Sequence, residues 1–595
     1  MNSLGFWTDR FHGPRGRICV DYGKVLNKGL IGVIGEIEEQ LARLPLGPLE
    51  ALGKRDTLRA MVIACNAVIA FARRYASLAK EMADNETDKA RKKELERISE
   101  ACQWVPANPA RTFYEAVQSF WFIHLVLEID HVSAGISPGR LPQYMYPFYR
   151  ADKEEGRITD EEAIELLELL FIKHTAICQY TKAQHFKESQ GSLFQNIALG
   201  GVNSLGEDAT TELDFLVLEA QKRVRMPQPT LSVLYHDKLS QEFLLKAAGV
   251  VRTGIGMPAF FNGNLNTQRL ISQGASLEDA RNQCIIGCVE VGFSHTAKSM
   301  LGSGINMPKY LEMALYNGKD PLSGMQIGLQ TGNAETFKSY DELREAILKQ
   351  FQYFFPLRME ISQLGYAVCA QCVPYPLTSA LVDDCIEKGM EINAGGARYC
   401  MDGDGPVGIT DLADSLAAVK KLIFEDKSVT MKELLKALKD NFEGHEELLR
   451  LLLGAPQYGN NIDYVDSIAR EWYDIFWEEH RGFKDFLGNI QRPFAISVVW
   501  HSPFGAKTGA LPSGRKAHGT LADGGGSASP GRDKNGPTAL IKSVTKSIDC
   551  GRYAANLLNM KFHPSALATK EGLMKLIALI KSYMDLGGHH VQFNV

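Results

Sequence analysis

The sequence lacks the features that mark several large classes of protein. No stretch approaches the ~20 consecutive apolar residues of a membrane-spanning helix, and the polar start of the chain contains no apolar signal core. The net charge is only −5 over 595 residues, with Lys and Arg dispersed along the chain. A charge of this sign and size argues against nucleic acid as the main partner. We therefore expect a cytoplasmic protein that binds neither membrane nor nucleic acid.

Cysteine is sparse and follows no framework. There are 11 cysteines, an odd number, and their scattered spacing does not predict a secreted disulfide scaffold. Cys369 and Cys372 form the single C-x-x-C pair in the chain. No second pair stands at zinc-finger spacing, and no βα redox setting surrounds this one, so we predict neither a metal site nor a redox role for it.

What is present is the composition and pattern of a large α/β protein. Hydrophobic residues make up 45% and charged residues 23% of the chain, as in soluble globular proteins. Short apolar runs such as Thr230 to Tyr235 and Pro258 to Asn262 alternate with helical patterns, which predicts strands buried by surrounding helices. Phe494 to Trp500 is predicted to be a further strand. Apolar residues at helical spacing predict helices over 33–46, 56–103 and 111–128, and over most of 408–490.

One stretch, Gln283 to Glu290, combines a thiol with a carboxylate. If the backbone from Ile285 to Glu290 is extended, Cys288 and Glu290 point to the same side, with Val289 packed behind them. A negative neighbour raises a thiol pKa, which does not suit a thiolate nucleophile. The pair suits a sulfur radical, which takes a hydrogen atom from carbon while the carboxylate moves a proton. The alternative is a buried cysteine with an unrelated glutamate nearby.

Further motifs occur in a consistent order along the chain. They are Ser137-Pro138-Gly139-Arg140, Gln195 to Gly201, Gly254 to Asn262, Ile286 to Glu290, Ala394 to Tyr399, Gly509 to Lys516 and Gly588 to Val595. Together these motifs resemble those of the glycyl radical enzymes of the pyruvate formate-lyase-like superfamily. The resemblance covers most of the chain.

The resemblance implies a fold that periodicity alone does not predict. It implies a ten-stranded barrel of two five-stranded halves surrounded by helices, with the catalytic Cys loop inside. Residues 1–504 would form the barrel body, with its N-terminal helical region partly missing, and 505–595 would begin the glycine radical domain. Relatives carry the radical glycine in an Arg-Val-x-Gly-Tyr-type loop, which does not occur here. We therefore expect the radical on a residue missing from this chain, no bound cofactor, and no activity from this chain alone. Without the missing domain, apolar lining such as Phe593 is expected to be exposed to water.

The resemblance also suggests residues that bind the substrate. Phe194 falls where relatives place an aromatic ring over the substrate, and Ser137 falls where dehydratases contact a substrate hydroxyl. Arg17 would favour an anionic substrate, because a guanidinium suits carboxylate or sulfonate oxygens. His295 is the only imidazole close in sequence to Cys288 and could be an acid/base or hydrogen-bond within the loop. Three of these residues also have a structural alternative. Phe194 could be a core aromatic, Ser137 part of an ordinary Ser-Pro turn, and Arg17 a surface arginine.

The implied activity is that of a radical lyase. Cys288 as a thiyl would take a substrate hydrogen, and Glu290 would assist elimination of water, an amine or sulfite from a small polar substrate. Arylacetate-type decarboxylation is the runner-up, because such enzymes keep the Cys-x-Glu pair. Formate acetyltransferase activity uses two adjacent cysteines, whereas Val289 follows Cys288 here. An inert fragment, or a subunit completed by a separate radical domain, is also open. The implied partners are a radical-SAM activating enzyme and a second copy in a homodimer.

Overall fold

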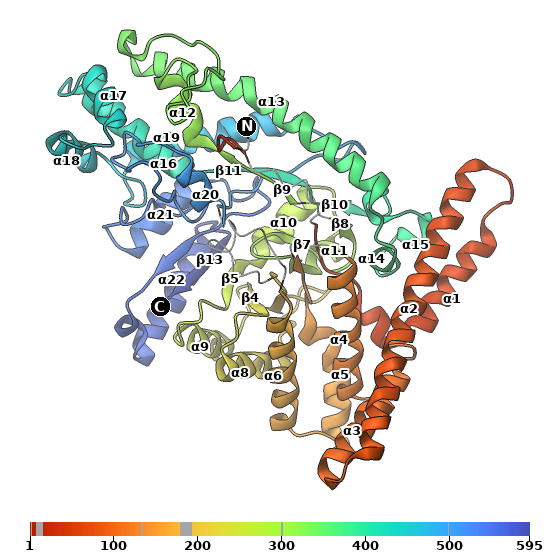
Figure 1. Cartoon of the computed structure of the whole chain (residues 1–595). Coiled ribbons are helices and arrows are strands. Elements are labelled where there is room, and N and C mark those ends of the chain that lie inside the picture. The colour runs from red at the N-terminus through yellow and green to blue at the C-terminus, as the bar shows by residue number, and fades with distance from the viewer. Residues whose placement is uncertain (2, 8–15, 132–134, 179–192, 299–300, 498) are drawn as a thin grey trace.

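The fold is a group of short strands enclosed by helices (Figure 1). The computed structural model describes residues 1–595 except 2, 8–15, 132–134, 179–192, 299–300 and 498. The described strands are β1 (Arg17–Ile18), β2 (Gly135–Ile136), β3 (Asn196–Gly200), β4 (Thr230–Tyr235), β5 (Ala259–Asn262), β6 (Gln283–Ile285), β7 (Val291–Phe293), β8 (Ala297–Lys298), β9 (Leu301–Asn306), β10 (Tyr399–Cys400), β11 (Gly403–Val407), β12 (Asn559–Lys561) and β13 (His590–Asn594).

One five-stranded sheet runs in the order β12-β13-β5-β4-β3. Its neighbours are parallel except β13 and β5, which are antiparallel. Strands β3 and β5 are buried at every residue, which explains the apolar runs Ile197 to Leu199 and Ala259 to Phe261 within them. Strands β12 and β13 come from the last 40 residues, so the C-terminal segment completes a sheet begun by the body. The other described strands pair in twos: β1 with β2, β8 with β10 and β9 with β11 in parallel, and β6 with β7 antiparallel.

Helices surround these strands. The first are α1 (Tyr22–Arg43), α2 (Leu49–Asn85), α3 (Lys89–Trp104), α4 (Phe113–Asp130), α5 (Leu141–Glu154) and α6 (Asp160–Ala176). The middle of the chain adds α8 (Glu212–Val224), α9 (Gln241–Val251), α10 (Gly263–Ser272), α11 (Leu277–Arg281), α12 (Met307–Leu315), η1 (Ala334–Thr336), α13 (Tyr340–Cys372), α14 (Pro376–Ala380), α15 (Cys385–Lys388) and η2 (Ile392–Ala394). The last are α16 (Ile409–Val419), η3 (Lys420–Glu425), α17 (Met431–Lys439), α18 (Glu446–Gly454), α19 (Asp463–His480), α20 (His501–Ala506), α21 (Pro537–Ser547), η4 (Pro564–Leu567) and α22 (Lys570–Asp585).

Local sequence signals explain where several helices begin. The Thr159 side chain accepts from the backbone N–H of Glu162, and the Glu162 carboxylate accepts from the backbone N–H of Thr159, a capping box that starts α6. Asp21 caps α1 through a single bond, because its carboxylate accepts the Lys24 N–H at 2.8 Å. This cap fixes the chain directly after β1, the strand that contributes Arg17 to the site described below.

Three local expectations from the sequence are wrong. The backbone from Ile285 to Glu290 is not extended, because the chain turns between β6 and β7. Phe494 to Trp500 forms no strand in its described residues; Ala495 makes one isolated bridge, with Asn556. Phe593 is not wet: it is 1% exposed and packs against the rings of Phe260 and Phe562.

Helix α2 modifies the expectation about membranes. It contains a window with mean hydropathy 1.3 that is apolar enough to cross a bilayer by length and composition, and 33% of this window is buried. A core helix of a soluble protein passes the same test, so this single helix is weak evidence for a span.

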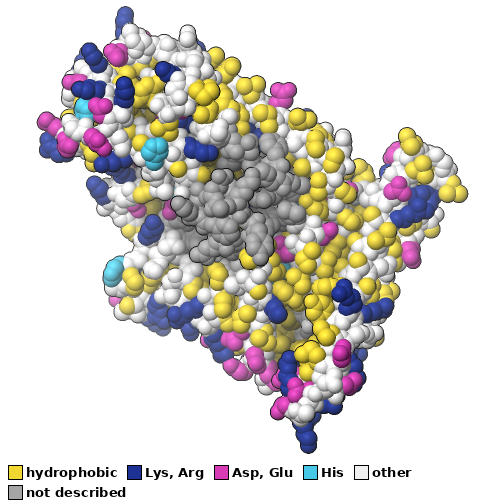
Figure 2. Space-filling model, viewed as in Figure 1, with side chains coloured by type: hydrophobic (Ala, Val, Ile, Leu, Met, Phe, Trp, Pro, Cys, Tyr) yellow, Lys and Arg dark blue, Asp and Glu magenta, His cyan; other side chains and the backbone are white. Residues whose placement is uncertain are grey.

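Hydrophobic side chains also gather on the surface between α13 and α2 (Figure 2). The exposed ones include Leu357, Leu364 and Val368 on α13 and Ile63 on α2.

Candidate active site

A β-hairpin carries Cys288 at its tip. Strands β6 and β7 pair in antiparallel register, and the Ile286 N–H donates to the Glu290 carbonyl at 2.8 Å, which closes the turn. Gly287 adopts φ of +97°, a conformation that glycine tolerates best. A Cβ at this position would lie 2.3 Å from Arg17 Cδ. The glycine therefore permits both the turn and the close approach of the arginine.

Three functional groups meet at the Cys288 sulfur. Cys288 Sγ lies 3.5 Å from Glu290 Oε2, and Arg17 Nη1 donates to the sulfur at 2.9 Å. Arg17 Nη1 also forms an ion pair with Glu290 Oε1. The side chains of Arg17 and Glu290 are only 4% and 10% exposed, so this pair is largely removed from water. In a buried pair the loss of one partner leaves an uncompensated charge, which is costly.

Ser137 fastens the tip of the hairpin to the sheet. Its Oγ accepts the Gly287 N–H at 2.9 Å and the Asn196 N–H at 3.3 Å, and it therefore bridges the Cys loop and β3. Its own N–H donates to the Ile18 carbonyl at 2.7 Å, which extends the pairing of β1 and β2. The position of the thiol thus depends on segments far apart in the sequence.

Phe194 covers the other side of the arginine. The Arg17 guanidinium carbon lies 5.5 Å from the centre of the Phe194 ring, within cation–π range. Gly135, which pairs with Arg17, lies so close to this segment that a Cβ would be 2.3 Å from the Phe194 carbonyl oxygen. The contact between β2 and the start of β3 therefore requires a glycine and brings the ring to the site.

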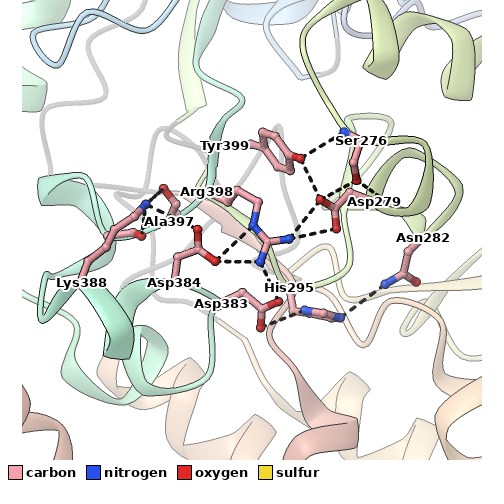
Figure 3. A network of polar contacts seen from close by, with 11 residues as sticks. Ser276, Asp279, Asn282, His295, Asp383, Asp384, Lys388, Ala397, Arg398 and Tyr399 are labelled. Atoms are coloured by element: carbon pink, nitrogen blue, oxygen red, sulfur yellow. Dashed lines mark hydrogen bonds and ion pairs between the residues drawn. The ribbon is translucent and has the colours of Figure 1, made fainter. Parts of the chain in front are cut away.

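The structure brings together five of the six candidate residues from the sequence: Arg17, Ser137, Phe194, Cys288 and Glu290. Their roles in binding and catalysis stay predictions. His295 lies instead at the base of the hairpin, where its contacts are with Asn282 and Asp383 (Figure 3).

Sequence reasoning missed two features of the site. It paired the thiol with a carboxylate alone, whereas Arg17 supplies a cation that contacts both. The separation of 271 positions between Arg17 and Cys288 explains the omission, because no local pattern joins them. The role of Gly287 was also missed. A glycine inside an apparent strand is a known sign of a turn or of close backbone approach.

Two clusters of the described residues have the composition of a metal site. Cys400, Asp402 and Asp485 form one, but Lys298 Nζ lies 2.8 Å from Asp402 and 3.6 Å from Asp485 and so takes the place of a cation. Asp21, His295 and Asp383 form the other, beside the hairpin base. The cysteines of the C-x-x-C pair end α13 and belong to neither cluster.

Several known proteins are similar to this chain in sequence and fold. The pyruvate formate lyase-like family model matches residues 5–505, and the glycine radical model matches residues 522–595. Trans-4-hydroxy-L-proline dehydratase of Clostridioides difficile is 38% identical over 587 residues, 98% of this chain and 74% of the relative. Isethionate sulfite-lyase of Oleidesulfovibrio alaskensis is 38% identical over 596 residues, which cover 97% of this chain and 70% of the relative. The glycerol-bound B12-independent glycerol dehydratase of Clostridium butyricum superposes with a TM-score of 0.95 at 39% identity, covering 100% of this chain and 75% of that one.

Fold and site together define a radical enzyme with a cysteine inside an α/β barrel. The chain belongs to the pyruvate formate-lyase-like family of glycyl radical enzymes, among the dehydratases and lyases. The predicted fold class and enzyme class are confirmed. The match over 522–595 places a glycine radical domain in this chain. That match supports a protein-derived radical, but it does not support the expectation that the radical residue is missing from the chain.

Proposed function

We propose that Cys288 and Glu290 carry out a radical elimination on a small polar substrate. The observation that carries this proposal is the 3.5 Å distance between Cys288 Sγ and the Glu290 carboxylate, at the tip of a buried hairpin. A thiol and a proton carrier at this separation can both reach adjacent atoms of one substrate.

The reaction needs one hydrogen-atom transfer and one proton transfer. A glycyl radical supplies the one-electron chemistry that removes the hydrogen atom of the Cys288 thiol. The resulting sulfur takes a hydrogen atom from a substrate carbon. Glu290 then accepts the proton of the neighbouring hydroxyl or delivers one to the leaving group, so that water, an amine or sulfite departs. The product radical then takes the hydrogen atom back from the Cys288 thiol, and the thiyl would recover a hydrogen atom from the radical glycine, which restores the site.

Arg17 is suited to hold an anionic group of the substrate. Its Nε is buried and has no hydrogen-bond partner among the described residues, so one donor is available. When Glu290 takes up a proton its charge is lost, and Arg17 then has a positive charge to share with a carboxylate or sulfonate. Phe194 and Ser137 would complete the substrate pocket. This assignment favours substrates such as the hydroxyproline and isethionate named for the two relatives.

Activation and assembly follow the family. We propose that a radical-SAM enzyme generates the radical on a glycine of the glycine radical domain, that the protein works as a homodimer, and that it acts in the cytoplasm. Oxygen destroys such radicals, so the activity belongs to cells with little oxygen.

A panel of substrates tests the proposal. The activated enzyme is offered small 2-hydroxy, 2-amino and 2-sulfonate compounds with and without an anionic group, together with arylacetates. We expect elimination products from the anionic members, and an Arg17→Gln variant that loses preference for them at least tenfold in kcat/KM. Carbon dioxide from arylacetates alone would support the decarboxylase instead, and equal use of neutral substrates by both forms would overturn the role of Arg17.

A further inference from the structure

His295 lies at the base of the hairpin whose tip carries Cys288. The Ser294 N–H donates to the Asn282 carbonyl at 3.2 Å, which continues the hairpin pairing one step beyond β6 and β7. The Asn282 side-chain amide lies 3.4 Å from His295 Nε2. The imidazole therefore contacts the residue that directly precedes β6, across the base of the hairpin.

A second element holds the imidazole from the other side. His295 Nδ1 lies 3.3 Å from Asp383 Oδ1, and the Asp383 N–H donates to the His295 carbonyl at 2.9 Å. Asp383 belongs to the segment between α14 and α15, which has no direct contact with the thiol in the described structure. Both the side chain and the backbone of His295 are thus attached to this segment.

Arg398 joins the same contacts into a network (Figure 3). Its guanidinium lies 2.7 Å from Asp384 and 3.5 Å from Asp383 on one side, and 3.0 Å from Asp279 on the other. The Tyr399 hydroxyl also donates to Asp279, at 2.7 Å. Asp279 lies on α11, directly before β6, so the network connects both ends of the hairpin to the segment that bears Asp383.

His295 lines a cavity at the base of the hairpin. The cavity it lines has a volume of ≈ 280 Å³, and its other described lining residues include Asp21, Tyr22, Arg140 and Asn282. The described lining includes neither Cys288 nor Glu290. This arrangement argues against contact between the imidazole and a substrate held at the sulfur.

We propose that His295 is a positioning residue for Cys288, and that its ion pair with Asp383 fixes the base of the hairpin so that the thiol stays opposite Glu290. The inference rests on the proposed function of Cys288. It predicts that protonated imidazole holds the hairpin more firmly than neutral imidazole, because only the cation pairs with the carboxylate.

The charged groups around His295 support this state. Burial alone would lower the pKa of His295, but contact with Asp383 and the nearby charge of Asp21 raise it above its ordinary value. Burial would raise the pKa of the Asp383 carboxyl, but contact with His295 and then the charges of Arg398 and Lys24 lower it below its ordinary value. A raised imidazole pKa means that the ion pair is complete below pH 6.5 and is lost as pH rises through the higher folded-state value.

Two substitutions in the pair and one elsewhere test the proposal in the activated enzyme. His295→Gln keeps a hydrogen bond to Asn282 but cannot be charged, and Asp383→Asn keeps the backbone bond but removes the anion. His445→Gln is the matched control, because His445 makes a similar pair, 2.9 Å from Asp440, on the surface. For each variant kcat and KM are measured from pH 5.5 to 8.5, with the radical content by electron paramagnetic resonance and Tm.

The pH profile separates positioning from a merely structural role. We expect His295→Gln to lower kcat roughly tenfold below pH 6.5 and less at high pH, with KM within about twofold, since misplacement of reacting groups by about 1 Å costs up to 10²-fold. Asp383→Asn should shift the alkaline fall in kcat to lower pH, and His445→Gln should match the wild type. Equal kcat profiles in all forms would overturn the proposal, as would a large change in KM alone, which would place His295 on the substrate. Cys288→Ala is measured alongside these variants. If it loses all activity, the proposed function of Cys288 stands, and equal profiles in the other forms count against the role of His295 alone.

Discussion

Replacing Glu290 by Gln is the most informative single change in the site. Gln keeps the volume and can still accept the Val289 N–H, which donates to Glu290 Oε2 at 3.1 Å. It cannot take a proton at neutral pH. General acid–base help is worth ~10²–10⁴-fold in rate, or about 3–5 kcal/mol of activation free energy. We therefore expect kcat for elimination to fall by that factor.

The same change removes the charge partner of Arg17, which affects stability separately. Both side chains are at most 10% exposed, and loss of one partner from a buried pair costs roughly 3–5 kcal/mol. Glu290→Gln should therefore also lower Tm. In the double variant Arg17→Gln/Glu290→Gln neither charge remains, so Tm should recover most of the loss.

Comparison of the two variants isolates the proton carrier. Both are activated, their radical content is measured, and kcat is expressed per radical. The account predicts that the double variant regains stability but stays at least 10²-fold slow. Recovery of activity together with stability would refute the reasoning, because Glu290 would then only neutralise Arg17. A loss of less than tenfold in Glu290→Gln alone would fit a decarboxylase better.

Three other predictions concern the surroundings of the thiol. Gly287→Ala should cost about 1–2 kcal/mol of stability from backbone strain alone and should displace Arg17. Both the urea concentration at the unfolding midpoint and kcat should therefore fall. Ser137→Ala leaves the buried Gly287 N–H unpaired, which should cost about 1–3 kcal/mol in stability and lower kcat, whereas Ser137→Thr should retain both. Burial raises the pKa of Glu128 to about 8, although the Ile136 N–H, which donates a hydrogen bond to the carboxylate, acts to lower it. The native carboxyl stays protonated while the unfolded one ionises above about pH 4.5, so stability declines up to about pH 8. Glu128→Gln lacks this titration, so the Tm of the variant relative to that of the wild type should rise from pH 5 to pH 8.

The sequence predicted those parts of the fold that local patterns encode. The strand over Thr230 to Tyr235 has the predicted bounds, and the strand predicted over Pro258 to Asn262 begins one residue later, at Ala259. Phe494 to Trp500 shows the limit of such patterns. Its described residues make only isolated hydrogen bonds to neighbouring segments: the Phe494 N–H donates to the Asp404 carbonyl, and the Ala495 N–H donates to the Ala555 carbonyl. An apolar run without a continuous ladder of such bonds does not make a strand.

The candidate site was predictable to the extent that motifs carry it. Cys288 and Glu290 stand two residues apart, so their proximity could be predicted even though the extended backbone was wrong. Their contact with Arg17 depends on the pairing of β1 with β2, which no local signal specifies. His295 shows the opposite error: it is close to Cys288 in sequence, but the hairpin places tip and base apart.

The proposed radical elimination depends most directly on the Cys288 sulfur. The decisive measurement compares Cys288→Ala with Cys284→Ser, the buried neighbour in β6, in the activated enzyme. Both should give the glycyl doublet in electron paramagnetic resonance. Cys284→Ser should turn over substrate and exchange substrate hydrogen with deuterated solvent, whereas Cys288→Ala should do neither. Turnover or exchange by Cys288→Ala at the level of Cys284→Ser would contradict the account.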